Sequence, residues 1–184
     1  MSALLERLDN IRQLIVSPEF LEGKGLSNEV NIHIFCYEPS EEMAVRHFLK
    51  MLMADTTLPC NLIEYNLYNV FLSICDDKRI TDKIAVQEEK KGKKFILDQL
   101  CRLANNTAFI NKMQYEPHNE GDVLLITGVG EAFPFIRVHA LLDAMQPCFS
   151  EPILVMYPGT FDGRNLQLFN QLKPNSYYRA FNVI

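Results

Sequence analysis

The residues best placed for chemistry follow two apolar runs in the second half of the chain. The turn Thr127-Gly-Val-Gly-Glu131 follows one run, and Tyr157-Pro-Gly-Thr-Phe-Asp-Gly163 follows the other. Glycines after a buried strand can bring backbone N–H groups to an anion at the start of a helix. A carboxylate at the same edge, such as Asp162, could act as an acid or base. Phosphate binding and acid–base chemistry are therefore the two kinds of function to test first.

The first glycine turn matches a phosphate site only in part. Gly128 and Gly130 fit the first two glycines of the dinucleotide fingerprint G-x-G-x-x-G, but Phe133 stands where close helix–strand packing requires glycine or alanine. Glu131 would repel an anion. Either these glycines only let the chain turn, or they form a degenerate phosphate site with Arg137 as its counter-charge.

The junction at residues 34–42 lacks a phosphate loop. Such a loop needs several glycines, a lysine and a Ser or Thr to close on phosphate and magnesium. This segment has no glycine and no lysine, and it carries Glu41 and Glu42. These acids are better explained as partners of a helix dipole, so nucleotide hydrolysis through this loop is not expected.

Asp162 permits three interpretations. With Gly163 it can form a tight turn, it can cap a helix that starts at Gly163, or it can serve a hydrolase together with His139. The spacing places Arg137 about two turns into the helix that follows Gly130. There it could pair with an acid across a subunit surface, or extend its charged end to water.

Tyr177, Tyr178 and Arg179 stand together near the C-terminus. Tyrosine and arginine are enriched at interface hot spots, and a buried final strand is the alternative explanation. We assign no catalytic, cofactor-binding or metal-ligating residue. The candidate partner-binding residues are Arg137, Asp162, Tyr177, Tyr178 and Arg179, and the candidate strand-end turns are Gly128, Gly130, Gly159 and Gly163.

Cysteine usage argues against metal and redox chemistry. The five cysteines are an odd number, none forms a C-x-x-C pair, and no histidine stands beside them at metal-ligand spacing. Cysteines in apolar segments behave as small hydrophobic residues. They are expected to be reduced core thiols of a cytosolic protein.

The net charge of −5 is unevenly distributed. Residues 78–112 contain nine Lys or Arg and four Asp or Glu, an excess of +5, so the remainder sums to −10. Acids alternate with the bases in Glu88–Lys94, and no aromatic residue stands among these lysines to stack on bases. A solvated helix face is therefore expected, and direct nucleic-acid binding is not.

Hydrophobic periodicity predicts an alternation of helices and strands. Glycine weakens a helix interior, so Gly92 should weaken the long helical region in its middle. Expected helices cover residues 3–16, 40–54, 67–74, 81–105 and 107–113, and a further helix should follow each glycine turn. Expected strands cover residues 28–37, 61–65, 122–127, the run from 153, and the C-terminal 177–184.

The two strand–turn–helix units predict the fold class. Right-handed crossovers would join the strands into one α/β domain of residues 1–184. It would have three layers, with a mostly parallel sheet of about five strands between helices, and would be Rossmann-like or degenerate P-loop-like. No apolar run reaches the roughly 18 to 20 residues that cross a bilayer, so no membrane association is expected.

Several motifs together resemble one known family. They are Asn28-Glu29 with Phe35, Tyr37 and Pro39, the Thr127–Gly130 turn, Tyr157-Pro-Gly-Thr-Phe-Asp-Gly-x-Asn-Leu-x-Leu-Phe169, and Asn175-x-Tyr-Tyr-Arg-Ala-Phe181. Over nearly its whole length the chain resembles the BrxB family of the BREX (bacteriophage exclusion) systems.

The resemblance implies a cytoplasmic component of a defence system that blocks phage replication. Its implied partners are the alkaline-phosphatase-like protein PglZ, an AAA+ ATPase and an adenine-specific DNA methyltransferase, which carry the obvious catalytic machinery. We therefore expect a non-enzymatic adaptor without a cofactor, most simply one that binds PglZ. The alternative is a degenerate nucleotide- or phosphate-binding module without hydrolase activity. Homodimer formation and contact with DNA inside the assembly stay open.

Overall fold

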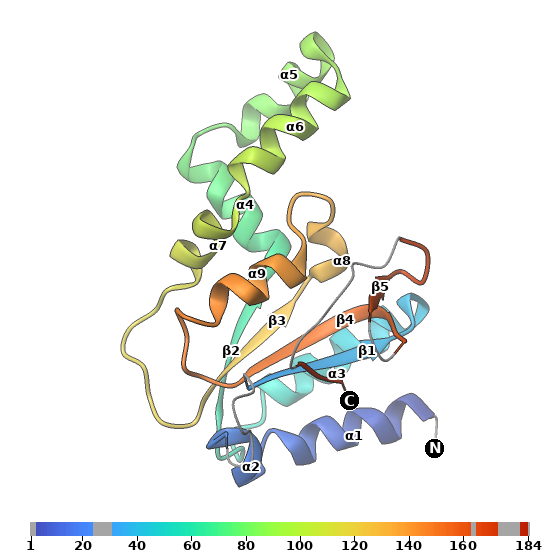
Figure 1. The fold of residues 1–184 in the computed structure, drawn as a ribbon, viewed down its shortest axis with the longest axis vertical. Coiled ribbons are helices and arrows are strands. Elements are labelled where there is room, and N and C mark those ends of the chain that lie inside the picture. Colours follow the sequence, from blue (N-terminus) through green and yellow to red (C-terminus); the bar gives the residue numbers. More distant parts are fainter. Residues whose placement is uncertain (1–2, 24–30, 163–164, 173–180, 184) are drawn as a thin grey trace.

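The computed structural model describes residues 3–23, 31–162, 165–172 and 181–183 (Figure 1). A twisted sheet lies between two layers of helices, and a pair of helices projects from one end of the molecule. Among the described residues, no helix is both long and apolar enough to cross a membrane.

Five strands form a parallel sheet in the order β2-β3-β4-β1-β6. A short strand, β5, pairs with the end of β4 in the antiparallel sense. The predicted three-layer α/β class with a mostly parallel sheet is confirmed. The strands are β1 (Ile32–Tyr37), β2 (Asn61–Asn66), β3 (Asp122–Thr127), β4 (Ile153–Phe161), β5 (Leu166–Leu168) and β6 (Phe181–Val183).

The central strands are apolar because both of their faces are buried. Successive side chains point to opposite faces, so Leu124 and Ile126 of β3 pack into one core, and Val123 and Leu125 pack into the other. Helices α4, α7 and α9 cover the first core, and α1 and α3 cover the second. The bounds are α1 (Ala3–Leu14), α2 (Pro18–Leu21), α3 (Glu42–Met53, after the 3₁₀ turn Pro39–Glu41), α4 (Leu67–Asp77), α7 (Asn106–Met113), α8 (Val129–Ala132) and α9 (Val138–Met145).

Residues 81–103 form a helical hairpin, which we call the arm. It consists of the 3₁₀ turn Thr81–Lys83, α5 (Ile84–Lys91) and α6 (Lys93–Leu103). Gly92 separates the helices with φ +85° and ψ 154°, a region open essentially to glycine alone. The predicted weak point is therefore a complete break, and the arm extends away from the sheet (Figure 1).

The helix predicted after Gly130 is interrupted. Helix α8 ends at Ala132 because Pro134 has no N–H and forces Phe133 into an extended conformation (φ −70°, ψ 137°). Helix α9 begins only at Val138. Arg137 precedes this helix as its N-cap, so the prediction that it lies two turns into a helix is wrong.

The second predicted strand–turn–helix unit is also wrong, because a β-hairpin replaces it. Strand β4 continues through Pro158 and Gly159 to Phe161, and residues 166–168 return beside it as β5. Among the described residues after Asp162, Asn165 is in no helix and residues 166–168 form β5, so Asp162 caps no helix that the structure describes. The alternation of Leu166 and Leu168, a period of two, is the sequence signal for this strand.

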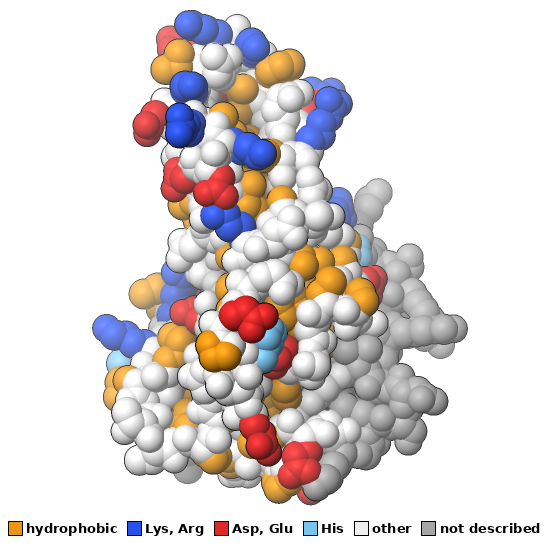
Figure 2. Space-filling model, turned by 90° about the vertical axis from the view of Figure 1, so that its left-hand side faces the viewer, with side chains coloured by type: hydrophobic (Ala, Val, Ile, Leu, Met, Phe, Trp, Pro, Cys, Tyr) orange, Lys and Arg blue, Asp and Glu red, His pale blue; other side chains and the backbone are white. Residues whose placement is uncertain are grey.

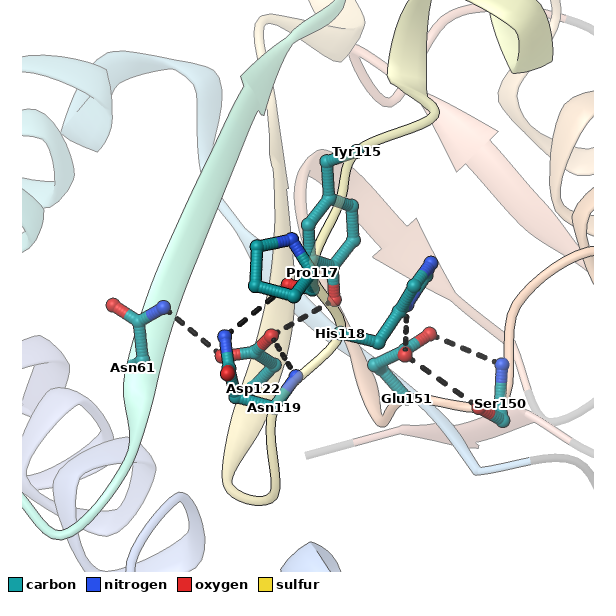
Figure 3. A network of polar contacts seen from close by, with 8 residues as sticks. All are labelled: Asn61, Tyr115, Pro117, His118, Asn119, Asp122, Ser150 and Glu151. Carbon is teal, nitrogen blue, oxygen red and sulfur yellow. Dashed lines mark hydrogen bonds and ion pairs between the residues drawn. The ribbon is translucent and has the colours of Figure 1, made fainter.

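A buried carboxylate joins the strands at their amino ends (Figure 3). Asp122 is only 2% exposed and accepts hydrogen bonds from Asn61 Nδ2 at 3.0 Å, the Asn119 N–H at 2.9 Å and the Tyr115 hydroxyl at 3.2 Å. Burial alone would raise the pKa of Asp122, but these hydrogen bonds lower it below its ordinary value. The loop before β3 is thereby fixed to β2 and β3.

A second contact at the same edge joins two loops. His118 Nδ1 lies 2.5 Å from Glu151 Oε1, next to the Tyr115 ring (Figure 3). The hydrogen bond to Glu151 raises the pKa of His118. Both contacts lie at the edge opposite the strand ends where α/β proteins bind ligands, and they organise the fold.

Candidate functional site

The carboxyl ends of the parallel strands carry a cluster of paired charges. Arg46 of α3 donates from Nε to Glu42 Oε1 at 2.6 Å, and its terminal nitrogen lies 2.8 Å from Glu131 Oε1 of α8. The Tyr37 hydroxyl donates to Glu42 Oε2 at 2.5 Å. One guanidinium therefore connects the element after β1 to the element after β3.

These contacts change the ionisation of the cluster. The hydrogen bonds to Glu131 and Glu42 raise the pKa of Arg46. Burial, and then the bond to Glu42, raise the pKa of the Tyr37 phenol. Tyr37 is therefore protonated at neutral pH and positions Glu42; it is unsuited to act as a base.

The neighbouring strand ends are bound to each other by polar side chains. Thr127 donates from its hydroxyl to Glu64 Oε1 at 2.7 Å, which joins β3 to β2. Asn66 accepts from the first N–H groups of α4 and caps that helix. Gly128 has φ +67°, and a Cβ there would lie 2.5 Å from Asn66 Oδ1, so both the conformation and the space require glycine.

The β4–β5 hairpin closes the strand-end crevice. The Phe169 ring packs on Gly130, where an added Cβ would lie 2.8 Å from the ring. The Phe169 N–H donates to Pro158 O at 2.8 Å, and Asn170 Nδ2 donates to Glu38 Oε2 at 2.7 Å. The turn that follows β5 thus contacts the loops after both β1 and β3.

A second close contact explains Gly159. A Cβ at this position would lie 2.1 Å from Gln167 O of β5, so only glycine lets the two strands of the hairpin approach. The candidate strand-end glycines that the structure describes therefore have packing roles in closing this edge. Gly163 lies outside the described residues.

A cavity of about 300 Å³ remains between these elements. Its lining includes Tyr37, Glu42, Arg46, Glu131 and Phe169. Among the described residues of the lining, Arg46 is the single cation, and it already pairs with both carboxylates. A polyphosphate would gain little here, because the charge that should attract it is neutralised.

Arg137 and His139 line a separate cavity of about 260 Å³, together with Tyr157 and Leu166. Burial, and then the charge of Arg137, lower the pKa of His139, and Asp143 opposes this. His139 is therefore neutral at neutral pH. These two predicted residues do come together, beside the β4–β5 hairpin.

Asp162 takes part in a turn of its own. Its carboxylate accepts from the Asn165 N–H at 2.6 Å and from Asn165 Nδ2 at 3.1 Å, and its own N–H donates to Asn165 O at 3.1 Å, so it joins the two strands of the hairpin. Tyr177, Tyr178 and Arg179, the other candidate partner-binding residues, lie outside the described residues.

In the described ranges, no three His, Cys, Asp or Glu side chains gather as a metal site would require. Burial raises the pKa of Cys36 to about 11, although Arg7 opposes the shift. Burial likewise raises the pKa of Cys60, Cys75 and Cys101. These thiols are protonated at neutral pH and are poor nucleophiles.

Sequence reasoning missed the charge cluster and the closing turn. Glu42 and Arg46 are four residues apart, the spacing of an ion pair on a helix. This one contact of the cluster could therefore have been predicted from the sequence. The contacts of Glu131 and Phe169 with their partners arise only from tertiary structure. They could not be predicted from one sequence.

The fold and site define a class of protein: a parallel α/β domain whose strand-end crevice is covered by its own hairpin. Comparison with known proteins gives the family. The family model for "BREX protein BrxB" matches residues 63–183. The chain is 38% identical to the BREX protein BrxB of Bacillus cereus (strain H3081.97), over 100% of this chain and 99% of that protein.

It is also 28% identical to the BREX protein BrxB of Escherichia coli O9:H4 (strain HS), over 97% of this chain and 90% of that protein. No solved structure matches the chain significantly. The chain belongs to the BrxB family, as the sequence motifs predicted.

Proposed function

We propose that this chain is a non-enzymatic adaptor of a BREX defence system, a cytoplasmic protein that binds the PglZ-like component. Family membership supports the place in the system, since its relatives are named BREX protein BrxB. The AAA+ ATPase and the DNA methyltransferase are the further partners in the assembly. One domain of residues 1–184 carries this role.

One observation favours an adaptor over a ligand-binding enzyme: the turn after β5 covers part of the crevice where this fold class usually binds its ligand, and the arginine in the cavity that remains is already paired. The Phe169 ring packs on Gly130, and Glu131 neutralises Arg46 in the remaining cavity. A degenerate nucleotide module would need those positions to be open to phosphate. The surface around the hairpin, with Arg137 beside it, is then available for a protein partner.

The C-terminal segment tests this role. We expect Tyr178→Ala and Arg179→Ala to weaken co-purification with the PglZ-like protein, because tyrosine and arginine side chains contribute most at interfaces. The loss should reach roughly tenfold or more, about 1.4 kcal/mol or above. Pull-down of each BREX component separately, beside a thermal melt of each variant, measures this.

The melt separates the two explanations of this segment. An unchanged melt with weakened pull-down supports the interface. A collapsed melt would show that these residues belong to the core and would remove them from the proposed interface. If the wild-type chain co-purifies with none of the components, the adaptor role itself is wrong.

A further inference from the structure

The arm carries apolar side chains that the other described residues leave partly exposed. Helix α5 is described in full and has no buried residue, and within α6 only Leu100 is buried. Phe95 is 42% exposed and Val86 is 48% exposed. The base of the arm joins the core, since Leu100 belongs to the core cluster and Ile84 and Ile96 pack against it. Phe95 lies in the groove and stays half-exposed, whereas Val86 is exposed outside the groove.

A groove of about 370 Å³ runs between the two helices of the arm. Ile84 of α5 and Phe95, Ile96 and Leu100 of α6 supply its apolar walls. The groove is open to solvent. The arm that carries it projects away from the sheet (Figure 1). Amphipathic helices of partner proteins commonly bind with their apolar face in such a hydrophobic groove.

The charges around this groove are segregated. Lys83 and Lys91 belong to its lining, and Lys91 Nζ lies 4.9 Å from the centre of the Phe95 ring. Among the described residues, no carboxylate belongs to the lining. The four acids of the arm, Asp82, Glu88, Glu89 and Asp98, all lie off the groove. Acidic and basic residues alternate along the sequence of the arm, but in the described part of the chain only the basic ones line the groove.

The excess positive charge of this region is visible on the surface. Lys and Arg side chains gather over the projecting end of the molecule, with hydrophobic and some Asp or Glu side chains between them (Figure 2). An occupant that matches this surface must present apolar side chains flanked by carboxylates.

We propose that the arm groove docks an acidic amphipathic helix of a partner protein, with its apolar side chains on Phe95 and Ile84 and its carboxylates on Lys83 and Lys91. This rests on the adaptor role proposed above and adds a second contact surface, on the arm, to the one proposed around the hairpin and the C-terminal segment. Nucleic acid fits less well, since phosphates would leave the apolar walls uncovered and would meet the acids on the other faces of the arm.

Matched charge reversals test the groove. The groove variant is Lys83→Glu with Lys91→Glu, and the control is Lys90→Glu with Lys94→Glu. Both pairs change the net charge by −4, and both place one substitution near a helix start and one in the last turn of α5. Only the first pair lies in the groove. Helix-dipole and overall charge effects are therefore similar in the two variants.

The measurement is calorimetric affinity for the PglZ-like protein, the partner of the proposed function, with a thermal melt of every variant. We expect binding to weaken roughly tenfold or more in the groove variant and about threefold or less in the control. Phe95→Ala should also weaken binding without lowering the melt, because this side chain is largely exposed.

Each other outcome overturns the proposal. If the wild-type chain binds and both charge pairs weaken binding equally, or neither does, the groove is not the docking site, while the adaptor role stands. The same holds if the groove variant loses only duplex DNA binding, or only self-association in sedimentation. If the wild-type chain binds no component, the adaptor role and the docking proposal fail together.

Discussion

Asp122 shows how a single buried carboxylate organises the amino-end edge of the sheet. Three hydrogen bonds stabilise its charged form and lower its pKa despite burial. A group whose pKa is depressed on folding adds stability above its unfolded pKa, about 3.9, and loses this contribution as pH falls through the folded pKa.

We expect Asp122→Asn to lower the free energy of unfolding by about 1–3 kcal/mol at pH 7, because buried donors lose a charged acceptor. The difference from the wild-type chain should shrink as pH falls from about 5 towards 2. Urea unfolding at several pH values measures this, with the exposed Asp9→Asn as control. A difference that stays constant with pH would contradict the stated cause.

Single residues also show which features of the site can be predicted from the sequence and which cannot. The glycine pattern correctly located a crowded strand-end turn, because positive φ and close approach restrict Gly128 to one residue type. Gly130 is required because the Phe169 ring packs on it. Phe169 lies 39 positions further along the chain, so no local sequence pattern indicates this contact. The candidate residues at positions 177–179 stay predictions.

At the scale of elements, most helices and strands follow from hydrophobic periodicity. Strands β1, β3 and β4 were predicted because burial on both faces produces apolar runs. The edge strand β2 was also predicted, although it is only partly buried. The β4–β5 hairpin was not, because Pro158 and Gly159 resemble the end of a strand when the pairing with β5 is unknown. That missed element is the one that closes the crevice.

The contact between the hairpin and α8 gives a prediction. Gly130→Ala should destabilise the chain by about 1–3 kcal/mol, because its Cβ would lie 2.8 Å from the Phe169 ring. In a Phe169→Ala background the same change should cost less, since the ring is gone.

Chemical denaturation of the four chains in this double-mutant cycle yields the coupling energy. A coupling above about 0.5 kcal/mol is expected for residues in direct contact. Additive effects would show that the hairpin does not pack on α8 in solution.

The whole molecule divides into a closed α/β body and a projecting basic arm. The net charge of −5 does not reveal this division, because it is the sum of +5 in residues 78–112 and −10 in the rest of the chain. In the cavity at the strand ends Arg46 already pairs with Glu42 and Glu131, and the arm carries an apolar groove, the docking site that we propose. The chain belongs to the BrxB family, and both properties support the adaptor role that we propose for it.

Calorimetric titration of the purified chain, first with ATP, GTP and NAD and then with the PglZ-like protein, tests the central claim most directly. The account predicts no saturable heat from the nucleotides and saturable binding of the protein. Saturable nucleotide binding, or no binding of the protein, would contradict it.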